Sequence, residues 1–195
     1  MNKYDHFISL GHACQPAHNI RNILGQHEAY LFDWLVTPMP AVLMLLAPGG
    51  IDRFFGNKKS FENIDRHKNN IVVIHRPSEV VFYHDFTVRE DLKALDKVYA
   101  KYKFLYKRTD QALKTDKVLL IRHHCSKAEA VNLKNVLYKL YPSGNIDLLI
   151  VNDGPVQPSW SIDRIVNMTI NPAGVDWRGD MAGWSQILKQ YGGNK

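Results

Sequence analysis

The chain has 195 residues, of which 45% are hydrophobic and 23% are charged, and its formal net charge is +6. This composition argues against a disordered chain, and the length is close to that of one ordinary domain, so we predict a single α/β domain over residues 1–195. The mildly basic charge favours small anionic ligands. It is not a strong signal for nucleic acid, because Lys and Arg are spread along the whole chain.

The start of the chain and its cysteines predict a cytoplasmic protein. Residues 1–6 lead directly into an apolar segment, without the hydrophobic stretch and cleavage site of a secretory signal. The most apolar stretch, residues 41–46, is too short to cross a bilayer. Cys14 and Cys125 are too few for a disulfide framework, so we expect free thiols in a reducing compartment.

Hydrophobic periodicity alternates along the chain between strand-like and helix-like segments. Residues 51–70 are the exception, because they are polar and irregular and give only a weak strand signal around Phe54. In chain order the pattern predicts a strand at 7–11, helices at 16–24 and 38–46, a strand at 70–75, a strand or extended loop at 79–85, one long helix or a helix pair at 88–115, a strand at 117–122, a helix at 126–141, strands at 147–152 and 164–170, and a helix at 183–191.

Capping residues support the ends of three of these helices. Gly25 follows the first helix and suits a left-handed C-cap. Thr37 is expected as the N-cap of the second, with Pro38 at the first helical position. Ser126 and Glu129 have the spacing of a capping box. Apolar strands that alternate with helices predict a mostly parallel central sheet of about five strands with helices on both faces.

Polar side chains gather where the predicted strands end. In an open parallel sheet these carboxyl ends lie along one edge, where ligands bind. Thiols, imidazoles and carboxylates from separate segments are therefore expected to converge there. The residues concerned are His12, Cys14, His75, Arg76, His84, Asp85, His123, His124, Cys125, Asn152 and Asp153.

Cys14 is the strongest candidate nucleophile, because it falls at the start of the first helix. The unpaired N–H groups and dipole of a helix N-terminus stabilise an anion, so we expect a lowered thiol pKa and a place for an oxyanion. Gln15 could add a side-chain donor, and Gly11 would allow a tight turn. The alternative is that Cys14 is a small packing residue.

A nucleophilic cysteine also needs an imidazole base and a group that orients it. The sequence leaves both choices open. The candidate bases are His84, His75 and His12, and the candidate orienting groups are Asp85, Asp153 and Asp33.

Asp33 lies between apolar neighbours, so it is either paired structurally, which we favour, or functional. Residues 177–184 are expected to form a packed lid or a closing helix. No metal site is expected at His123, His124 and Cys125, because adjacent residues of an extended chain point in opposite directions and no paired zinc spacing occurs. The phosphate-loop, dinucleotide and serine-hydrolase motifs are absent from the sequence.

These residues resemble a bacterial family of unknown function that is labelled as papain-like cysteine peptidases. The resemblance runs over about residues 6–188 and implies that Cys14 is the nucleophile and His84 the base. Papain-like sites place the cysteine at a helix N-terminus and the histidine on a later strand. The motifs that carry the resemblance are Ser9-Leu10-Gly11-x-x-Cys14, Phe32-Asp33-Trp34, His84-Asp85-Phe86, the basic-aromatic run to Lys107-Arg108, residues 118–122, and Trp177 with Asp180 and Trp184.

A second resemblance concerns the Gly11-x-x-Cys14-Gln15 stretch. It is similar to the start of a family of capsule-polysaccharide O-acetyltransferases that bind coenzyme A, although the spacing differs by one residue. This resemblance implies coenzyme A as a ligand and a sugar hydroxyl as the acyl acceptor. The papain-like reading requires no cofactor.

Two classes of function follow. The first is an acyl-transfer enzyme in which Cys14 attacks a peptide, glycan or small-molecule substrate, expected to be anionic, and His84 moves the proton. The second is a non-catalytic module that binds an anion or nucleotide. In the enzyme, substrate or oxyanion contacts are expected from Gly11, Gln15, Asp33, Arg108 and Arg122, and in the binding module the anion would be held by Arg76, Arg108 and Arg122.

Overall fold

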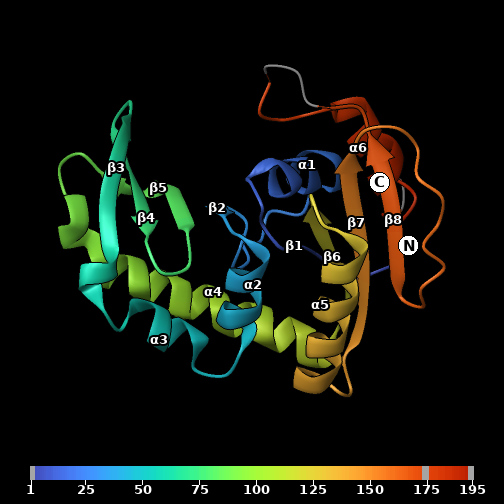
Figure 1. Ribbon diagram of the computed structural model, residues 1–195, viewed down its shortest axis with the longest axis horizontal. Coiled ribbons are helices and arrows are strands. Elements are labelled where there is room, and N and C mark those ends of the chain that lie inside the picture. Colours follow the sequence, from blue (N-terminus) through green and yellow to red (C-terminus); the bar gives the residue numbers. More distant parts are fainter. Residues whose placement is uncertain (1–2, 173–175, 193–195) are drawn as a thin grey trace.

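Two four-stranded sheets lie side by side in the computed structural model, which describes residues 3–172 and 176–192 (Figure 1). The first sheet is parallel, with the order β1-β6-β7-β8, and the second is antiparallel, with the order β2-β5-β4-β3. The strands are β1 (His6–Ser9), β2 (Leu35–Val36), β3 (Phe61–His67), β4 (Asn70–His75), β5 (Val80–Thr87), β6 (Lys117–His123), β7 (Asn145–Asp153) and β8 (Ile165–Ile170).

The parallel sheet is buried on both faces, as its continuous apolar runs predict. Along β6, Val118 and Leu120 face one hydrophobic cluster, whereas Leu119 and Ile121 face the other. Each of these four side chains is at most 1% exposed. Burial of one such side chain is worth about 1.5–3 kcal/mol, so a slip of the strand by one residue would exchange the two faces.

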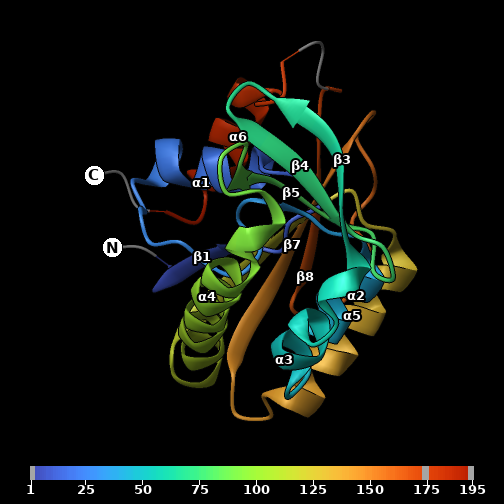
Figure 2. The same cartoon turned by 90° about the vertical axis from the view of Figure 1, so that its left-hand side faces the viewer.

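Helices cover the two faces of this sheet unequally (Figure 2). The short helices α1 (Gln15–Leu24) and α6 (Met181–Leu188) pack on one face, where Trp184 is fully buried. The opposite face is covered by α4 (Leu95–Thr115) and α5 (Lys127–Leu140). The α/β class and the helices on both faces are therefore confirmed.

The antiparallel sheet is a correction to the expected single sheet of about five strands. Residues 70–75 and 79–85 were expected beside the other strands, but as β4 and β5 they form hairpin partners in a separate sheet. Residues 51–70, which gave little signal, contain α3 (Gly50–Phe55), η1 (Lys58–Ser60) and β3. Phe54 is in a helix rather than a strand, and its ring packs 5.5 Å from that of Phe61.

The long helix α4 connects the two sheets, running along both of them (Figure 1). Residues 88–115 were predicted as one helix or a pair, and they form the short turn η2 (Asp91–Ala94) followed directly by α4. Tyr102, in the middle of α4, packs edge-on against Phe82 of β5, with ring centroids 5.5 Å apart. Ala112 and Leu113, near its end, are buried with the strands of the parallel sheet.

Two of the predicted caps are confirmed, and one is wrong. Gly25 ends α1 in the left-handed conformation with φ 67°, and the capping box of Ser126 and Glu129 starts α5. Helix α2 (Met39–Leu46) begins one residue later than expected, with Pro38 at its N-cap. Thr37 does not cap it, because its hydroxyl bonds to the β1–α1 loop instead.

No helix in residues 3–172 and 176–192 has both the length and the hydrophobicity needed to cross a membrane.

Candidate functional site

A pocket of about 660 Å³ opens where the first helix meets the antiparallel sheet. Its walls come from the β1–α1 loop, the segment around β2, the strands β3 and β5, and the C-terminal segment. Aromatic rings predominate among them, and none of the lining residues is Lys or Arg. The described residues that line it are Ala13, Cys14, Gln15, Trp34, Val36, His67, Tyr83, His84 and Trp177.

Cys14 and His84 face each other in this pocket, with 3.8 Å between Sγ and Nε2. Cys14 is the N-cap residue of α1, whereas His84 comes from β5, so the pair joins the start of a helix to a strand of the antiparallel sheet. A thiol and an imidazole at this separation are within reach of proton transfer, given the loose geometry common without substrate. Of the three candidate bases, the structure brings His84 to Cys14.

A bulge in β5 explains how neighbouring residues can share the pocket. Ile71 and Val73 of β4 are two residues apart, but they pair with Phe86 and Phe82, which are four apart. The extra residues fall at positions 83–85, where regular alternation would send neighbouring side chains to opposite faces. Tyr83 and His84 both line the pocket as a result.

The β1–α1 loop that carries Cys14 is fixed by Thr37 and Arg122. The backbone N–H of His12 donates to Thr37 Oγ1, which in turn donates to the Leu10 carbonyl. Gly11 has φ +74°, and a Cβ there would lie 2.1 Å from Thr37 Oγ1, so no larger residue fits. The predicted role of Gly11 in a tight turn therefore has a clear geometric basis.

Arg122 is buried and bonds to backbone atoms instead of facing the pocket. Its guanidinium donates to the Leu10 carbonyl at 2.7 Å and to the Thr37 carbonyl at 2.8 Å. These bonds join the parallel sheet to the segment that leads into α2. The expected contact of Arg122 with a substrate is replaced by this structural role.

The thiol and the imidazole are both held in their neutral forms. Burial, followed by the nearby negative charges of Asp33 and Asp85, raises the pKa of Cys14 to about 11. Burial also lowers the pKa of His84 below its usual value. The expected lowering of the thiol pKa by the helix N-terminus is therefore wrong, because burial and the two carboxylates outweigh it. The geometry suits a base that removes the proton during attack, rather than a resting ion pair.

Gln15 lies at the first position of α1, directly after Cys14. Its side chain is buried, and Oε1 has no hydrogen-bond partner within the described residues. The amide packs against Gly179, where a Cβ would lie 1.7 Å from Nε2 and where φ is +74°. Within the described chain no backbone carbonyl accepts from the N–H of Gln15. This end of α1 therefore offers polar groups beside the thiol, as expected.

Asp33 is paired, and the pair supports a wall of the pocket. Its carboxylate accepts from the Tyr30 N–H at 3.0 Å and from Arg21 at 3.3 Å. Burial raises the pKa of Asp33 to about 6, despite these two partners. The Arg21 guanidinium lies over the Trp34 ring, which meets the His84 ring edge-on at 5.8 Å. Asp33 thus supports the pocket wall through Arg21 and Trp34, and it acts on Cys14 through its charge rather than through a hydrogen bond.

Asp85 does not orient His84 by a hydrogen bond. Its buried carboxylate accepts from Lys101 and from the Tyr102 hydroxyl, so it holds β5 against α4. Among the described residues no carboxylate is hydrogen-bonded to His84. The site therefore contains a cysteine–histidine pair, with the charge of Asp85 nearby, and not the hydrogen-bonded triad that the sequence suggested.

Three further candidates lie away from the pocket. His75 bonds to Ser78, and its ring packs 4.1 Å from Phe54, so it is part of the aromatic core. Arg108 donates to the Ala29 carbonyl and lies over Phe104. Arg76 is paired with Glu62. In this geometry none of the three lines the pocket.

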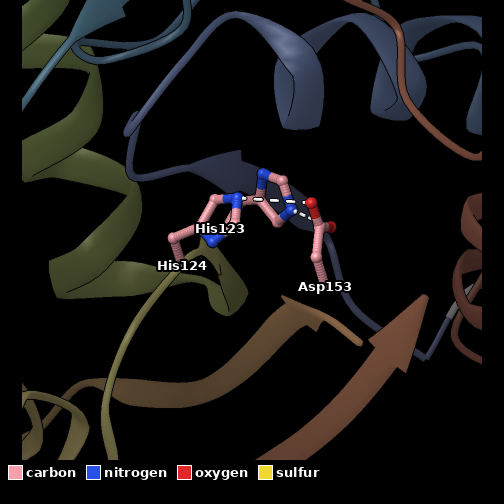
Figure 3. A group of neighbouring side chains, drawn as sticks. All are labelled: His123, His124 and Asp153. Carbon is pink, nitrogen blue, oxygen red and sulfur yellow. Dashed lines mark hydrogen bonds and ion pairs between the residues drawn. The ribbon is translucent and has the colours of Figure 1, made fainter. Parts of the chain in front are cut away.

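His12 and Asp153 belong to a second polar cluster at the end of the parallel sheet, and Figure 3 shows Asp153 there with His123 and His124. Asp153 Oδ1 lies 2.9 Å from His123 Nε2, and Oδ2 lies 3.5 Å from His124 Nε2. The His12 ring is 4.5 Å from that of His124. Burial, followed by the neighbouring His124, lowers the pKa of His12 to about 4. His12 therefore faces this cluster and not Cys14.

We expected the side chains of His123 and His124 to point in opposite directions, as in an extended chain, but this expectation is wrong. His124 follows the end of β6 in a left-handed conformation with φ 53°, and this turns its ring back beside that of His123. The two ring centroids are 4.0 Å apart. A left-handed conformation at a residue other than glycine is uncommon and is not evident from the residue types.

Sequence reasoning missed His67 and Tyr83 as pocket residues. His67 ends β3, in the segment that gave no clear pattern, and Tyr83 depends on the bulge in β5. Trp177 lines the pocket with 58% of its surface exposed, whereas Trp184 is packed in the core. The predicted closing segment is thus divided between a pocket wall and a buried helix.

The relation of the chain to known proteins agrees with this geometry. A family model described as "Putative papain-like cysteine peptidase (DUF1796)" matches residues 5–148. The chain belongs to this papain-like family. The match contains both Cys14 and His84, whereas Trp177 lies beyond it. The similarity to coenzyme A-binding acetyltransferases is not found, and no curated protein or solved structure matches the chain.

Proposed function

We propose that this member of the papain-like family is a cysteine-dependent acyl-transfer enzyme, with Cys14 as nucleophile and His84 as general base. The observation that carries the proposal is the 3.8 Å approach of Sγ to Nε2 in an open pocket. If Cys14 only filled space in the core, packing alone would not explain why the imidazole of His84 in β5 faces its thiol. The membership of the chain in the papain-like family supports the same assignment.

The first half of the reaction forms a thioester. Cys14 Sγ attacks the substrate carbonyl as its proton passes to Nε2 of His84, and the carbonyl oxygen becomes an oxyanion at the start of α1. The Gln15 N–H is the nearest helix-terminal donor on the chain. The imidazolium then gives its proton to the leaving nitrogen or oxygen as the bond to the carbonyl carbon breaks.

The second half releases the acyl group. A water molecule gives a proton to His84 Nε2 as its oxygen attacks the thioester carbonyl. The bond between the carbonyl carbon and Sγ then breaks, the imidazolium returns its proton to Sγ, and the carboxylic acid leaves. If a sugar hydroxyl attacks instead of water, the product is an ester and the enzyme is a transferase. The aromatic walls formed by Trp34, Tyr83 and Trp177 favour a substrate with an apolar or ring-shaped group next to the reacting carbonyl.

An activated ester tests the reacting pair directly. Wild-type protein is incubated with p-nitrophenyl acetate, nitrophenol release is followed, and the acyl adduct is located by mass spectrometry. We expect acetylation at Cys14 and none at that position in Cys14→Ala. His84→Ala should slow it roughly 10²–10⁴-fold, the usual contribution of a general base.

The second cysteine provides the matched control. Cys125 is buried away from the pocket, and its pKa is also raised by burial, so Cys125→Ala should acylate at the wild-type rate. Equal acylation of Cys14 in wild type and His84→Ala would refute the assigned pair. Steady turnover in water alone identifies a hydrolase, whereas a burst that continues only with an added hydroxyl or amine acceptor identifies a transferase.

A further inference from the structure

The cluster of His123, His124 and Asp153 lies where β6 and β7 end, outside the Cys14 pocket. One donor atom from each residue falls within 4.8 Å of the others. Figure 3 shows the two imidazoles on one side of the carboxylate, with Nε2 of each ring directed toward it. The proposed acyl-transfer chemistry uses none of these three side chains.

We propose that His123, His124 and Asp153 bind a divalent transition-metal ion of the zinc class. Two imidazoles and one carboxylate are a donor set that zinc favours, and three protein ligands leave a position for water or another ligand. Bonds of about 2.0–2.1 Å at tetrahedral angles place neighbouring donors about 3.3 Å apart. Nε2 of His123 lies 2.9 Å from one oxygen of Asp153 and Nε2 of His124 lies 3.5 Å from the other, so both rings approach the carboxylate at distances near that value. With one donor atom taken from each residue, all three atoms lie within 4.8 Å of one another, so side-chain rotation has only a short distance to close around an ion.

The fold presents these donors without rearrangement of the strands. His123 is 3% exposed, and its ring packs 5.7 Å from Trp184, so it is held rigidly at the end of β6. His124 remains accessible, which leaves a path for an ion. Helix α1 leaves β1 toward one face and α5 leaves the adjacent β6 toward the other. Ligands of open α/β sheets bind at such a switch point.

A second observation comes from the buried side chain of Trp184. Its indole Nε1 has no hydrogen-bond acceptor among the described residues, although the side chain is fully buried. A buried indole N–H normally has a hydrogen-bond acceptor, so the lack of an acceptor for Trp184 Nε1 requires an explanation. The rings of Trp184 and His123 are 5.7 Å apart, so this unpartnered N–H lies in the same region of the fold as the cluster.

Zinc binding to the full chain tests the site. Zn²⁺ affinity is measured by competition with a chromophoric chelator in the Cys14→Ser background, so that neither the reactive thiol nor the proposed catalysis contributes. We expect one ion per chain, and at least a tenfold loss of affinity in His124→Ala and in Asp153→Asn. His27→Ala removes an exposed histidine elsewhere and should bind as the parent does.

Two further readouts keep the result clear if a variant folds poorly. Bound Co²⁺ should give the visible absorption bands of a four-coordinate ion, and they should be lost in Asp153→Asn. Zn²⁺ should also raise the unfolding temperature of the parent but not of His124→Ala, because a ligand stabilises the state that binds it. Failure of the parent to bind Zn²⁺, or binding that both variants retain, would overturn the proposal. Cys14 acylation is measured separately, so either proposal can fail alone.

Discussion

The guanidinium of Arg21 lies 5.0 Å from the centre of the Trp34 ring, and the same side chain is paired with the buried carboxylate of Asp33. Trp34 in turn meets the edge of the His84 ring. A carboxylate that does not line the pocket is thus connected to His84 by three successive contacts. This gives the Phe32-Asp33-Trp34 motif a physical role in positioning His84.

Replacement of Asp33 by Asn tests whether this carboxylate positions His84. Asn keeps an acceptor for the Tyr30 N–H but removes the charge that holds Arg21 over Trp34. We therefore expect slower acylation of Cys14 by the activated ester, because the loss of support for His84 outweighs the lower thiol pKa that follows from removing the Asp33 charge. Asp52→Asn, at an exposed carboxylate outside the pocket, is the control and should leave the rate unchanged.

The same variant should change how stability depends on pH. The pKa of Asp33 in the folded protein is about 6, above its ordinary value, so its stabilising effect is complete below about pH 4 and is lost as the pH rises through 6. Relative to Asp33→Asn, the wild type should lose up to about 3 kcal/mol of unfolding free energy between pH 4 and 7. Chemical denaturation at both pH values measures this difference, and parallel curves would contradict the burial argument.

Neutral forms of Cys14 and His84 should give a distinctive pH profile. The thiol pKa is raised to about 11, so alkylation by iodoacetamide should be slow at pH 7 and should rise well beyond pH 8.5, where a free thiol is half ionised. The lowered pKa of His84 should keep acylation by the ester constant down to below pH 6.5. Thiolate absorbance already present at pH 7 would instead indicate an ion pair.

Loss of Arg122 should destabilise the fold. Arg122→Met leaves the Leu10 and Thr37 carbonyls without their donor, and we expect a loss of about 2–5 kcal/mol in unfolding free energy. Arg108→Met, which removes one bond to a carbonyl and a contact with Phe104, should cost about 1 kcal/mol. Denaturant titration measures both. If phosphate stabilises the wild type but not Arg122→Met, Arg122 binds an anion after all, and the purely structural role is contradicted.

Gly11 should tolerate no side chain for two reasons, its left-handed backbone conformation and the close approach of Thr37 Oγ1. Gly11→Ala and Gly49→Ala both place alanine at a left-handed φ, +74° and +69°, which costs about 1 kcal/mol. Only at position 11 does the new Cβ collide with a buried atom, Thr37 Oγ1. Gly11→Ala should therefore be clearly the less stable variant and should slow Cys14 acylation, whereas Gly49→Ala should react normally. Similar losses in both would show that conformation alone decides.

Local patterns in the sequence were enough to predict most of the helices and strands. The apolar run of β6, the capping box at Ser126 and the left-handed Gly25 are decided by nearby residues, so the sequence predicts them well. Cys14 was placed correctly at the start of α1 for the same reason. The papain-like resemblance then selected His84, which periodicity alone could not distinguish from His75.

Features that depend on pairing between distant segments could not be predicted. Nothing in the β4 and β5 sequences specifies that they form their own sheet, because a buried apolar run looks the same in either sheet. The bulge that directs Tyr83 into the pocket and the left-handed turn at His124 are likewise set by tertiary contacts. The direction of the Cys14 pKa shift could not be predicted, because the helix end is a local feature, whereas burial of the thiol and the approach of Asp33 and Asp85 arise only in the folded chain.

The division of the pocket between its reacting pair and its outer wall has a consequence for specificity. Cys14 and His84 both fall within residues 5–148, the segment that the family model matches, but Trp177 lies outside it. Sequence changes around Trp177 would alter the shape of the pocket without touching the chemistry. Under the proposed acyl transfer, the choice of substrate can thus differ between proteins that keep the same reaction, and substitution of Trp177 is a route to redirecting it.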